Sequence, residues 1–350
     1  MNLKSMAAEL GVSPATVSRV LNAKKNFSVS PEVRERILTL ARSSGYTPNP
    51  IYQSMRMKKN TQIAILQPYR IHVFGDTDIT AGVDYMCDLL WDRGFSFHSL
   101  NHINEHQREY QLPAWKVGAA VAVDVFREEL IVPLDRSGVP YVSLNGVAGP
   151  NGTAVMTDDY ANCRLALEHL HDLGHRRIAY INHYRSPEEV PFTLADQHYS
   201  VRERMRAYSD YCAKNGFEPP AESLSWNFTV SETVAAALRR KCTAFVSYSF
   251  SLGAEAIHYL KQSGLRVPAD ISLVVFNNPP LASFLDPPVT CIEIPALEMG
   301  KTAAELLLEK HKKSDWRNGE TIMFKGKLFQ RKSTAQPPRD WRGRHSGTQS

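Results

Sequence analysis

The sequence predicts a small all-α unit at the N-terminus, followed by a larger α/β region with two doubly wound parallel sheets. Three short amphipathic stretches within residues 3–45 predict the helical unit. From residue 61 onward, apolar runs alternate with helical stretches in two successive series, which is typical of parallel strands joined by crossover helices. The charge distribution supports this division, because residues 1–60 contain ten Lys/Arg and only three Asp/Glu, whereas the remainder contains 31 and 33.

The helical unit shows a start and a stop signal at each of its predicted helices. Ser13-Pro14 and Ser30-Pro31 each supply a Ser N-cap followed by a Pro at the first helical position. Gly11 permits a sharp turn between the first two helices, and Gly45 closes the third. The apolar stripes that would face a common core are Leu3, Met6, Ala7 and Leu10, then Val17, Val20 and Leu21, then Val33, Ile37, Leu40 and Ala41.

Two short helices joined by a tight glycine turn predict a helix-turn-helix unit, whose second helix fits the major groove of duplex DNA. We expect Arg19 to bond a guanine bidentately and Ala15 and Thr16 to contact a thymine methyl. Ser5 and Ser18 are suited to phosphate contacts, which position a protein without reading the base sequence. The same outer side of the second helix also carries Pro14 and Asn22. The excess of basic residues fits a polyanionic partner, although a solvated basic face is the simpler alternative.

These residues resemble the headpiece of the LacI/GalR family of transcriptional regulators. The matching segments are Gly11–Asn22, Val29–Ile37 and Gly45–Asn49, in order and at the N-terminus. The resemblance places Asn49 among the DNA-contacting residues and implies a hinge helix over residues 50–57 that folds on DNA. Met55 stands where the family has an apolar side chain that enters the minor groove; the alternative is an exposed linker side chain. Tyr52 departs from the family pattern, which has a small residue at this position.

The α/β region is predicted in two halves. Expected strands cover residues 63–66, 95–100, 117–123, 140–144, 177–181, 244–247 and 272–276, and expected helices lie near 78–93, 128–137, 159–173, 200–215 and 252–263. The family resemblance continues through Asp158–Tyr160, Gly174–Ala179, Val267–Leu273, Pro287–Thr290 and Arg331–Thr334. It implies the two-lobed fold of periplasmic sugar-binding proteins, with a ligand between the lobes.

The predicted boundaries follow from these segments. We expect a headpiece at 1–46, a hinge at 47–60 and a regulatory domain at 61–333. Within that domain, one lobe would comprise about 61–157 plus 292–320, and the other about 158–291 plus 321–333. The polar tail, 334–350, is predicted to be disordered.

Arg204 is the strongest candidate for contact with a small-molecule effector, because the resemblance places an effector-binding Arg at this point of a helix. A buried guanidinium can grip hydroxyls, a carboxylate or a phosphate, although an ordinary surface charge pair is the alternative. Asn145 and Asn277 each stand where sugar-responsive relatives have an Asp. Tyr248 stands at the first position of a pair that is Asn-Asp in those relatives. Loss of these carboxylates predicts a less neutralised Arg204 and thus favours an anionic or aromatic-lined site over one for an ordinary neutral hexose. Three aromatic side chains after the first strand, which could stack on a ligand or pack between subunits, are Tyr69, His72 and Phe74.

Other signals are weak. The stretch 182–200 is longer than in relatives and is either a lid or a tolerated surface loop. His171 and His175 are four apart but lack an accompanying ligand pattern, so we expect no metal and no cofactor. Five scattered cysteines, no export signal and no membrane-spanning run indicate a cytoplasmic protein.

The sequence therefore predicts a regulator, most simply a repressor and not an enzyme, that acts as a homodimer on near-palindromic operator DNA. Its effector would be a small molecule related to carbohydrates, and no membrane partner is expected. Three alternatives remain open: a plain solute-binding protein, an enzyme with a borrowed DNA-binding domain, and a regulator whose degenerate cleft responds to a protein partner. A missing export signal counts against the first, and the lack of a nucleophile or metal constellation counts against the second.

Overall fold

The structure is a computed structural model that describes residues 2–21, 27–46, 60–67, 79–100, 117–182, 198–225, 227–313 and 317–339. The chain separates into two compact units, Met1–Asn60 and Thr61–Ser350. The predicted hinge at 47–60 lies outside the described residues except for Asn60.

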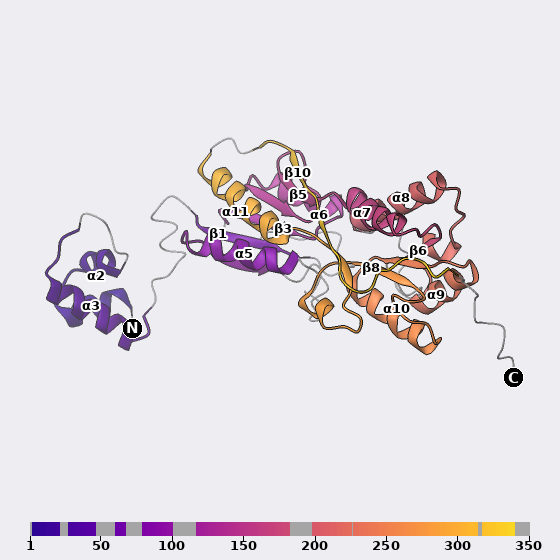
Figure 1. Ribbon diagram of the computed structural model, residues 1–350. Helices are drawn as coiled ribbons and strands as arrows, with labels where there is room; N and C mark the ends of the chain where they lie inside the picture. The colour runs from indigo at the N-terminus through magenta and orange to yellow at the C-terminus, as the bar shows by residue number, and fades with distance from the viewer. Residues whose placement is uncertain are drawn as a thin grey trace. The chain divides into compact units, whose positions relative to one another are not determined.

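The N-terminal unit contains the three predicted helices, α1 (Leu3–Leu10), α2 (Pro14–Leu21) and α3 (Pro31–Ser43) (Figure 1). The expected caps are present, since the Ser13 Oγ accepts from the Thr16 N–H at 3.0 Å and the Ser30 Oγ accepts from the Val33 N–H at 3.3 Å. Gly11 ends α1 at a φ of 66°, in the left-handed conformation that the sharp turn requires. The predicted apolar stripes supply the buried core: Met6, Ala7, Val17, Val20, Ile37 and Ala41.

The second unit has two sheets, each forming one lobe (Figure 1). The N-lobe sheet has the strand order β10-β5-β4-β3-β1-β2, and all its pairings are parallel. Its strands are β1 (Gln62–Leu66), β2 (Ser96–Leu100), β3 (Ala119–Val123), β4 (Tyr141–Leu144), β5 (Thr153–Thr157) and β10 (Glu320–Phe324). Helices α5 (Ile79–Trp91) and α11 (Ala296–Lys312) pack on one face, and α6 (Glu128–Arg136) packs on the other.

Helices α5 and α11 approach closely because each carries a glycine at their crossing. A Cβ on Gly300 would lie 2.0 Å from the Gly82 carbonyl oxygen, and one on Gly82 would lie 2.3 Å from the Ala296 carbonyl oxygen. No side chain fits at either position without a shift of backbone, so the two glycines set the spacing of the helices on this face.

The C-lobe sheet has the order β11-β9-β8-β7-β6. Its strands are β6 (Ile178–Ile181), β7 (Ala244–Ser247), β8 (Ser272–Phe276), β9 (Thr290–Glu293) and β11 (Lys327–Phe329). The sheet is covered by α7 (Asp159–Asp172) and α8 (Tyr199–Lys214) on one face and by α9 (Val230–Arg239) and α10 (Phe250–Gln262) on the other, with short 3-10 turns η2 (Ala221–Leu224) and η3 (Pro280–Ser283). The prediction of a wholly parallel sheet was wrong at one edge, because β11 runs antiparallel to β9.

The chain passes between the lobes three times: between β5 and α7, between β9 and α11, and between β10 and β11. The last two crossings come later than the predicted boundaries at 291/292 and 320/321. Strand β9 remains in the C-lobe sheet up to Glu293, and β10 extends the N-lobe sheet up to Phe324. The lobe to which each of these strands belongs is decided by the strand it pairs with, and the sequence alone does not show that partner.

The prediction of disorder over 334–350 was also wrong for its first residues. Ser272 Oγ accepts from the Ala335 N–H at 3.0 Å, and the Ala335 carbonyl accepts a bond from the His175 Nε2 at 2.9 Å. These contacts attach the segment up to residue 339 to the C-lobe, and residues 340–350 lie outside the described part of the chain.

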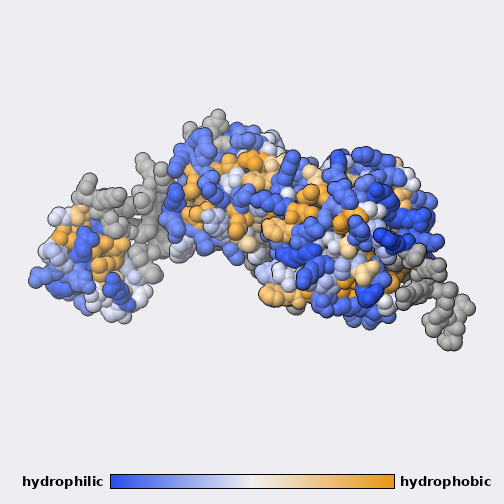
Figure 2. Space-filling model, viewed as in Figure 1, coloured by the Kyte–Doolittle hydropathy of each residue, from blue (hydrophilic) through white to orange (hydrophobic). Residues whose placement is uncertain are grey.

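Figure 2 shows hydrophilic residues over much of the visible face of the lobes, with hydrophobic residues in separate patches. The most exposed large apolar side chains among the described residues include Phe284 at 80%, Trp91 at 66% and Leu281 at 56%. Leu281 lies within the 3-10 turn η3 and Phe284 directly follows it, so the two form one small apolar surface on the C-lobe. No helix in the described ranges is long and apolar enough to cross a membrane.

Candidate functional site

One set of polar side chains in the second unit lies at the carboxyl ends of the parallel strands, where the lobes meet. Asp124, Asn145 and Asn277 directly follow β3, β4 and β8, and each has a left-handed backbone, with φ values of 54°, 55° and 68°. Non-glycine residues rarely adopt this conformation, and they concentrate at functional sites when they do. The strand ends therefore form the candidate effector site, in agreement with the general rule for open α/β sheets.

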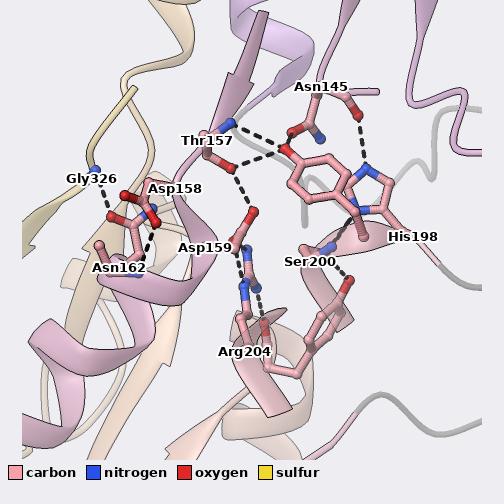
Figure 3. A network of polar contacts seen from close by, with 12 residues as sticks. Asn145, Thr157, Asp158, Asp159, Asn162, His198, Ser200, Arg204 and Gly326 are labelled. Carbon is pink, nitrogen blue, oxygen red and sulfur yellow. Dashed lines mark hydrogen bonds and ion pairs between the residues drawn. The ribbon is translucent and has the colours of Figure 1, made fainter. Parts of the chain in front are cut away.

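Arg204, on α8, lies at the centre of this site and is 6% exposed. Its Nε donates to the Asp159 Oδ1 at 2.7 Å, and its second terminal nitrogen lies 2.6 Å from the same oxygen (Figure 3). Its other terminal nitrogen donates to the Tyr248 carbonyl at 2.8 Å. The guanidinium carbon lies 3.7 Å from the centre of the Phe276 ring. All three guanidinium nitrogens and one face thus have protein contacts, and the alternative of a surface charge pair is wrong for this residue.

The expectation that Arg204 is poorly neutralised was wrong, because Asp159 supplies a buried counterion. Asp159 is 1% exposed and begins α7, where the positive end of the helix dipole also favours a carboxylate. The expectation rested only on positions where sugar-responsive relatives have acids, and Asp159 is not among the positions that were compared. Asp158 is indeed a helix cap that accepts from the Ala161 N–H at 2.9 Å, whereas Asp159 turns toward Arg204 (Figure 3). Because Arg204 is already paired with Asp159, it gives no reason to expect an anionic ligand.

From Asp159 the contacts continue into the N-lobe. The Thr157 hydroxyl donates to the Asp159 Oδ2 at 2.6 Å, and the Thr157 N–H donates to the Tyr199 hydroxyl at 3.1 Å. The Tyr199 hydroxyl in turn donates to the Asn145 Oδ1 at 2.9 Å, and the Asn145 amide donates to Asp124 at 2.7 Å. Tyr199 belongs to α8 of the C-lobe and Asn145 to the N-lobe, so this path joins the lobes.

A second path joins the lobes through His198, the N-cap of α8. Its Nδ1 accepts from the Ser200 N–H at 3.3 Å, so the proton lies on Nε2, which donates to the Asn145 carbonyl at 2.8 Å (Figure 3). The Ser200 hydroxyl lies 3.0 Å from the Tyr248 hydroxyl, and the Tyr248 carbonyl binds Arg204. Both paths begin at Asn145 and meet at Arg204, so these side chains form one closed ring of polar contacts, hereafter the junction ring.

Burial maintains the protonation states that the junction ring needs. Burial raises the pKa of Tyr199 and the Asp159 carboxylate raises it further, which keeps the hydroxyl proton that Asn145 accepts. Burial opposes the charge of Arg204, but the Asp159 carboxylate outweighs it and raises the pKa of Arg204 above its ordinary value. Burial also raises the pKa of Asp124, against the opposing effects of His198 and the Asn145 hydrogen bond.

Of the predicted effector residues, the structure brings Arg204, Asn145 and Tyr248 into this ring. Asn277 lies at the same strand edge, where its N–H donates to the Ile292 carbonyl at 3.0 Å. Tyr69, His72 and Phe74 lie outside the described residues. Sequence reasoning missed Asp124, Thr157, Asp159, His198 and Tyr199. The position of Asp124 and Thr157 at a strand end could have indicated their role. His198 and Tyr199 lie at the end of the stretch 182–200, of which residues 183–197 are not described.

In the N-terminal unit, α2 presents a largely exposed outer side. The predicted DNA contacts there are Pro14, Ala15 and Arg19, which are exposed, and Thr16 and Ser18, which are partly buried. The Arg19 guanidinium carbon lies 5.1 Å from the centre of the Phe27 ring, within the range of a cation–π contact. Asn22, Asn49 and Met55 lie outside the described residues.

Ser5 has a local role that the sequence argument did not foresee. Its hydroxyl donates to the Asn2 carbonyl at 2.8 Å as part of a capping box that begins α1. The hydroxyl is exposed, but a phosphate contact would have to compete with this bond, and the phosphate role of Ser5 stays a prediction.

The described part of the chain contains no group of three or more His, Cys, Asp or Glu placed to hold a metal ion. His171 Nδ1 bonds the Tyr211 hydroxyl at 3.0 Å, while His175 bonds Thr243 and Ser272 at 2.8 and 3.0 Å. The two histidines therefore have separate structural partners.

Comparison with known sequences decides between the classes that the residues left open. The profile for bacterial regulatory proteins of the lacI family matches residues 2–49, and that for a periplasmic binding protein-like domain matches residues 167–334. The chain is 28% identical over 317 residues to the HTH-type transcriptional regulator GalR of Streptococcus thermophilus, covering 87% of this chain and 91% of that one. It is 25% identical to catabolite control protein A of Priestia megaterium, covering 92% and 94%.

The chain joins a lacI-family DNA-binding domain to a periplasmic binding protein-like domain. It is accordingly a DNA-binding transcription regulator, and its relatives are regulators and not enzymes. Among solved structures, the complex of the transcriptional regulator CelR with cellobiose has a TM-score of 0.63 at 25% identity, covering 95% of this chain and 99% of that one. The lac repressor dimer bound to operator and the anti-inducer ONPF has a TM-score of 0.73 at 22% identity, covering 96% and 99%, and it supports the fold.

The two matching profiles assign separate tasks to the two parts of the chain. The family profile for DNA-binding regulators covers the helices whose outer side carries Arg19. The binding-protein-like profile covers α8, which carries Arg204. A plain solute-binding protein would not need a DNA-binding domain, so that alternative is excluded.

Proposed function

We propose that this LacI-family regulator is a cytoplasmic, non-catalytic repressor that binds near-palindromic operator DNA as a homodimer, with a carbohydrate-related small molecule controlling its affinity. The observation that carries the proposal is the combination, in one chain, of an exposed helix-turn-helix surface with a ring of buried polar groups at the junction of two lobes. A relative complexed with cellobiose supports the carbohydrate class.

In this mechanism α2 enters the major groove, and Arg19 reads a guanine while the helix N-termini and Ser18 contact phosphates. Two headpieces in a dimer would read half-sites roughly 10 base pairs or a multiple of that apart. An unbiased selection from random duplex DNA, followed by footprinting, tests the proposal. A two-fold repeated motif is expected, and no enrichment of any motif, with and without added cell extract, would refute operator binding.

The effector would bind where the lobes meet and change the contacts among Asn145, His198 and Tyr199, because these residues join the lobes. A ligand that alters this junction changes the angle between the lobes, and that change would alter operator affinity. Thermal-shift screening of sugars at the full-length protein, followed by operator titration with each hit, tests this step. We expect at least one sugar to stabilise the protein and to change operator affinity.

The homodimer is supported by the small apolar surface at η3, where Phe284 is 80% and Leu281 56% exposed. Exposed side chains of this size are frequent at subunit contacts. Sedimentation of Phe284→Ser at micromolar concentration should show more monomer than the parent protein, with Leu297→Ser, which changes another exposed apolar residue, as the control.

A second candidate function keeps DNA binding but replaces the small molecule by a protein partner. It is favoured by one observation: Arg204, Asn145 and Tyr248 already bond one another or their neighbours in the junction ring. Absence of stabilisation by any small molecule, together with intact operator binding, would select this alternative.

A further inference from the structure

Asp159 has the properties of a permanent counterion. Both its carboxylate oxygens are acceptors, since Oδ1 contacts two guanidinium nitrogens of Arg204 at 2.7 and 2.6 Å and Oδ2 accepts from the Thr157 hydroxyl at 2.6 Å. The carboxylate is almost completely buried and stands at the first position of α7, where the helix dipole favours negative charge. Its charge is therefore stabilised from three directions.

Arg204 has correspondingly little capacity for a second anion. Its charge is paired with Asp159, its remaining terminal nitrogen bonds the Tyr248 carbonyl, and its face packs against Phe276 at 3.7 Å. A carboxylate or phosphate that approached the guanidinium would also come within a few ångströms of Asp159. Like charges at such distances in a buried site repel strongly, and the repulsion offsets the attraction of the guanidinium.

We propose that Asp159 determines the charge class of the ligand: the junction site accepts neutral ligands and rejects anionic ones because its arginine carries a built-in counterion. The inference rests on the proposed function, namely that a small molecule binds at the lobe junction. Replacement of the Asp159 carboxylate by a neutral group converts the same arginine into an anion site.

The test compares the full-length protein with Asp159→Asn and with a matched control, Glu203→Gln. Glu203 also pairs with an arginine on α8, but its partner Arg206 is exposed and is not part of the junction ring. The control removes the same charge without altering the site. The probes are inorganic phosphate, gluconate and glucose 6-phosphate, compared with glucose and cellobiose, and binding is measured by calorimetry at constant ionic strength.

We expect the parent protein and Glu203→Gln to bind the three anions at least tenfold more weakly than Asp159→Asn does. Equal anion affinities in all three proteins would overturn the proposal. So would tighter binding of gluconate or glucose 6-phosphate than of glucose by the parent protein, if Arg204→Gln abolishes that binding.

If Asp159→Asn folds poorly, Asp159→Ala provides a second test through chemical rescue. That variant leaves Arg204 buried without a counterion, next to a space the size of a carboxylate. Formate should raise the melting temperature of Asp159→Ala by several degrees more than that of the parent protein. No differential stabilisation by formate or phosphate in either variant would show that Arg204 is not an anion site and would overturn the proposal. None of these measurements uses DNA, so failure of operator binding would refute the proposed function without affecting them.

Discussion

The key side chains of the two units of this regulator differ in their exposure to solvent. On α2 the groups proposed to meet DNA are mostly exposed, and Arg19 is held by one ring contact. At the lobe junction Arg204 is buried, and each of its three nitrogens has a partner. A surface for a polyanionic duplex can remain open in water, because its charge is fully solvated. A buried arginine has to be neutralised by the protein itself, so its counterion decides what else can bind.

The largest expected effect breaks the buried pair. Arg204→Leu leaves the Asp159 carboxylate buried without its counterion, which should lower the unfolding free energy of the second unit by about 3–5 kcal/mol. Arg206→Leu removes the exposed pair with Glu203 and should cost less than about 1 kcal/mol. Urea unfolding monitored by circular dichroism measures both. Equal stabilities of the two variants would contradict this prediction.

The next effect tests the exposed unit. Arg19→Ala should cost about 1–3 kcal/mol in discrimination between operator and random DNA, because a bidentate contact to guanine is lost. Fluorescence anisotropy at several salt concentrations measures both affinities. Arg42→Ala, which removes an exposed arginine at the end of α3, is the control and should weaken both affinities alike if it acts at all. Equal losses on both DNAs for Arg19→Ala would remove its role in reading bases.

A smaller effect concerns the contacts between lobes. Tyr199→Phe deletes the hydroxyl that Asn145 and Thr157 share, at a cost of about 1–2 kcal/mol in unfolding free energy. Tyr211→Phe removes a hydroxyl on the same helix whose partner, His171, lies in the same lobe. Small-angle scattering should show a wider spread of lobe angles for Tyr199→Phe than for Tyr211→Phe. An identical scattering profile for both would mean that the Tyr199 bridge does not restrain the lobes.

The smallest expected effect depends on pH. Burial lowers the pKa of His175, while the unfolded chain has a value near 6.5. As the pH falls below about 6.5, the unfolded state binds a proton that the folded state resists, so stability present at neutral pH is lost. His175→Gln should therefore show a shallower loss of unfolding free energy between pH 7.5 and 5 than the parent protein. Parallel pH profiles would exclude His175 as a source of acid sensitivity.

The sequence predicted most of the fold, because apolar patterning and caps are local signals. The expected strands at 244–247 and 272–276 coincide with β7 and β8 at both ends, and Ser13 and Ser30 cap the helices as predicted. The strands β5, β9, β10 and β11 and the helices α9 and α11 were not predicted. Helix α9 carried a readable signal, since Thr229 and Glu232 have the spacing of a capping box, and the structure shows that box.

The candidate effector site was predicted only in part. Arg204, Asn145 and Tyr248 were named by position, but their partners could not be, because Asp159 and Tyr199 reach them from 45 and 54 residues away in the chain. Whether a buried arginine is neutralised by the protein depends on such distant contacts, so the sequence could not show that Arg204 is paired with Asp159. Local patterns predict which residues are buried, whereas a pairing across lobes appears only in the folded chain.

The three passages between the lobes have a consequence for biosynthesis. The N-lobe begins before the C-lobe in the chain, but it cannot be completed until its last strand, β10, has left the ribosome, since that strand pairs with β5, 167 residues earlier. The headpiece, in contrast, closes its own core with the first 41 residues. A chain that terminates early would thus retain a folded DNA-binding headpiece without the two lobes. Such a fragment could not respond to an effector.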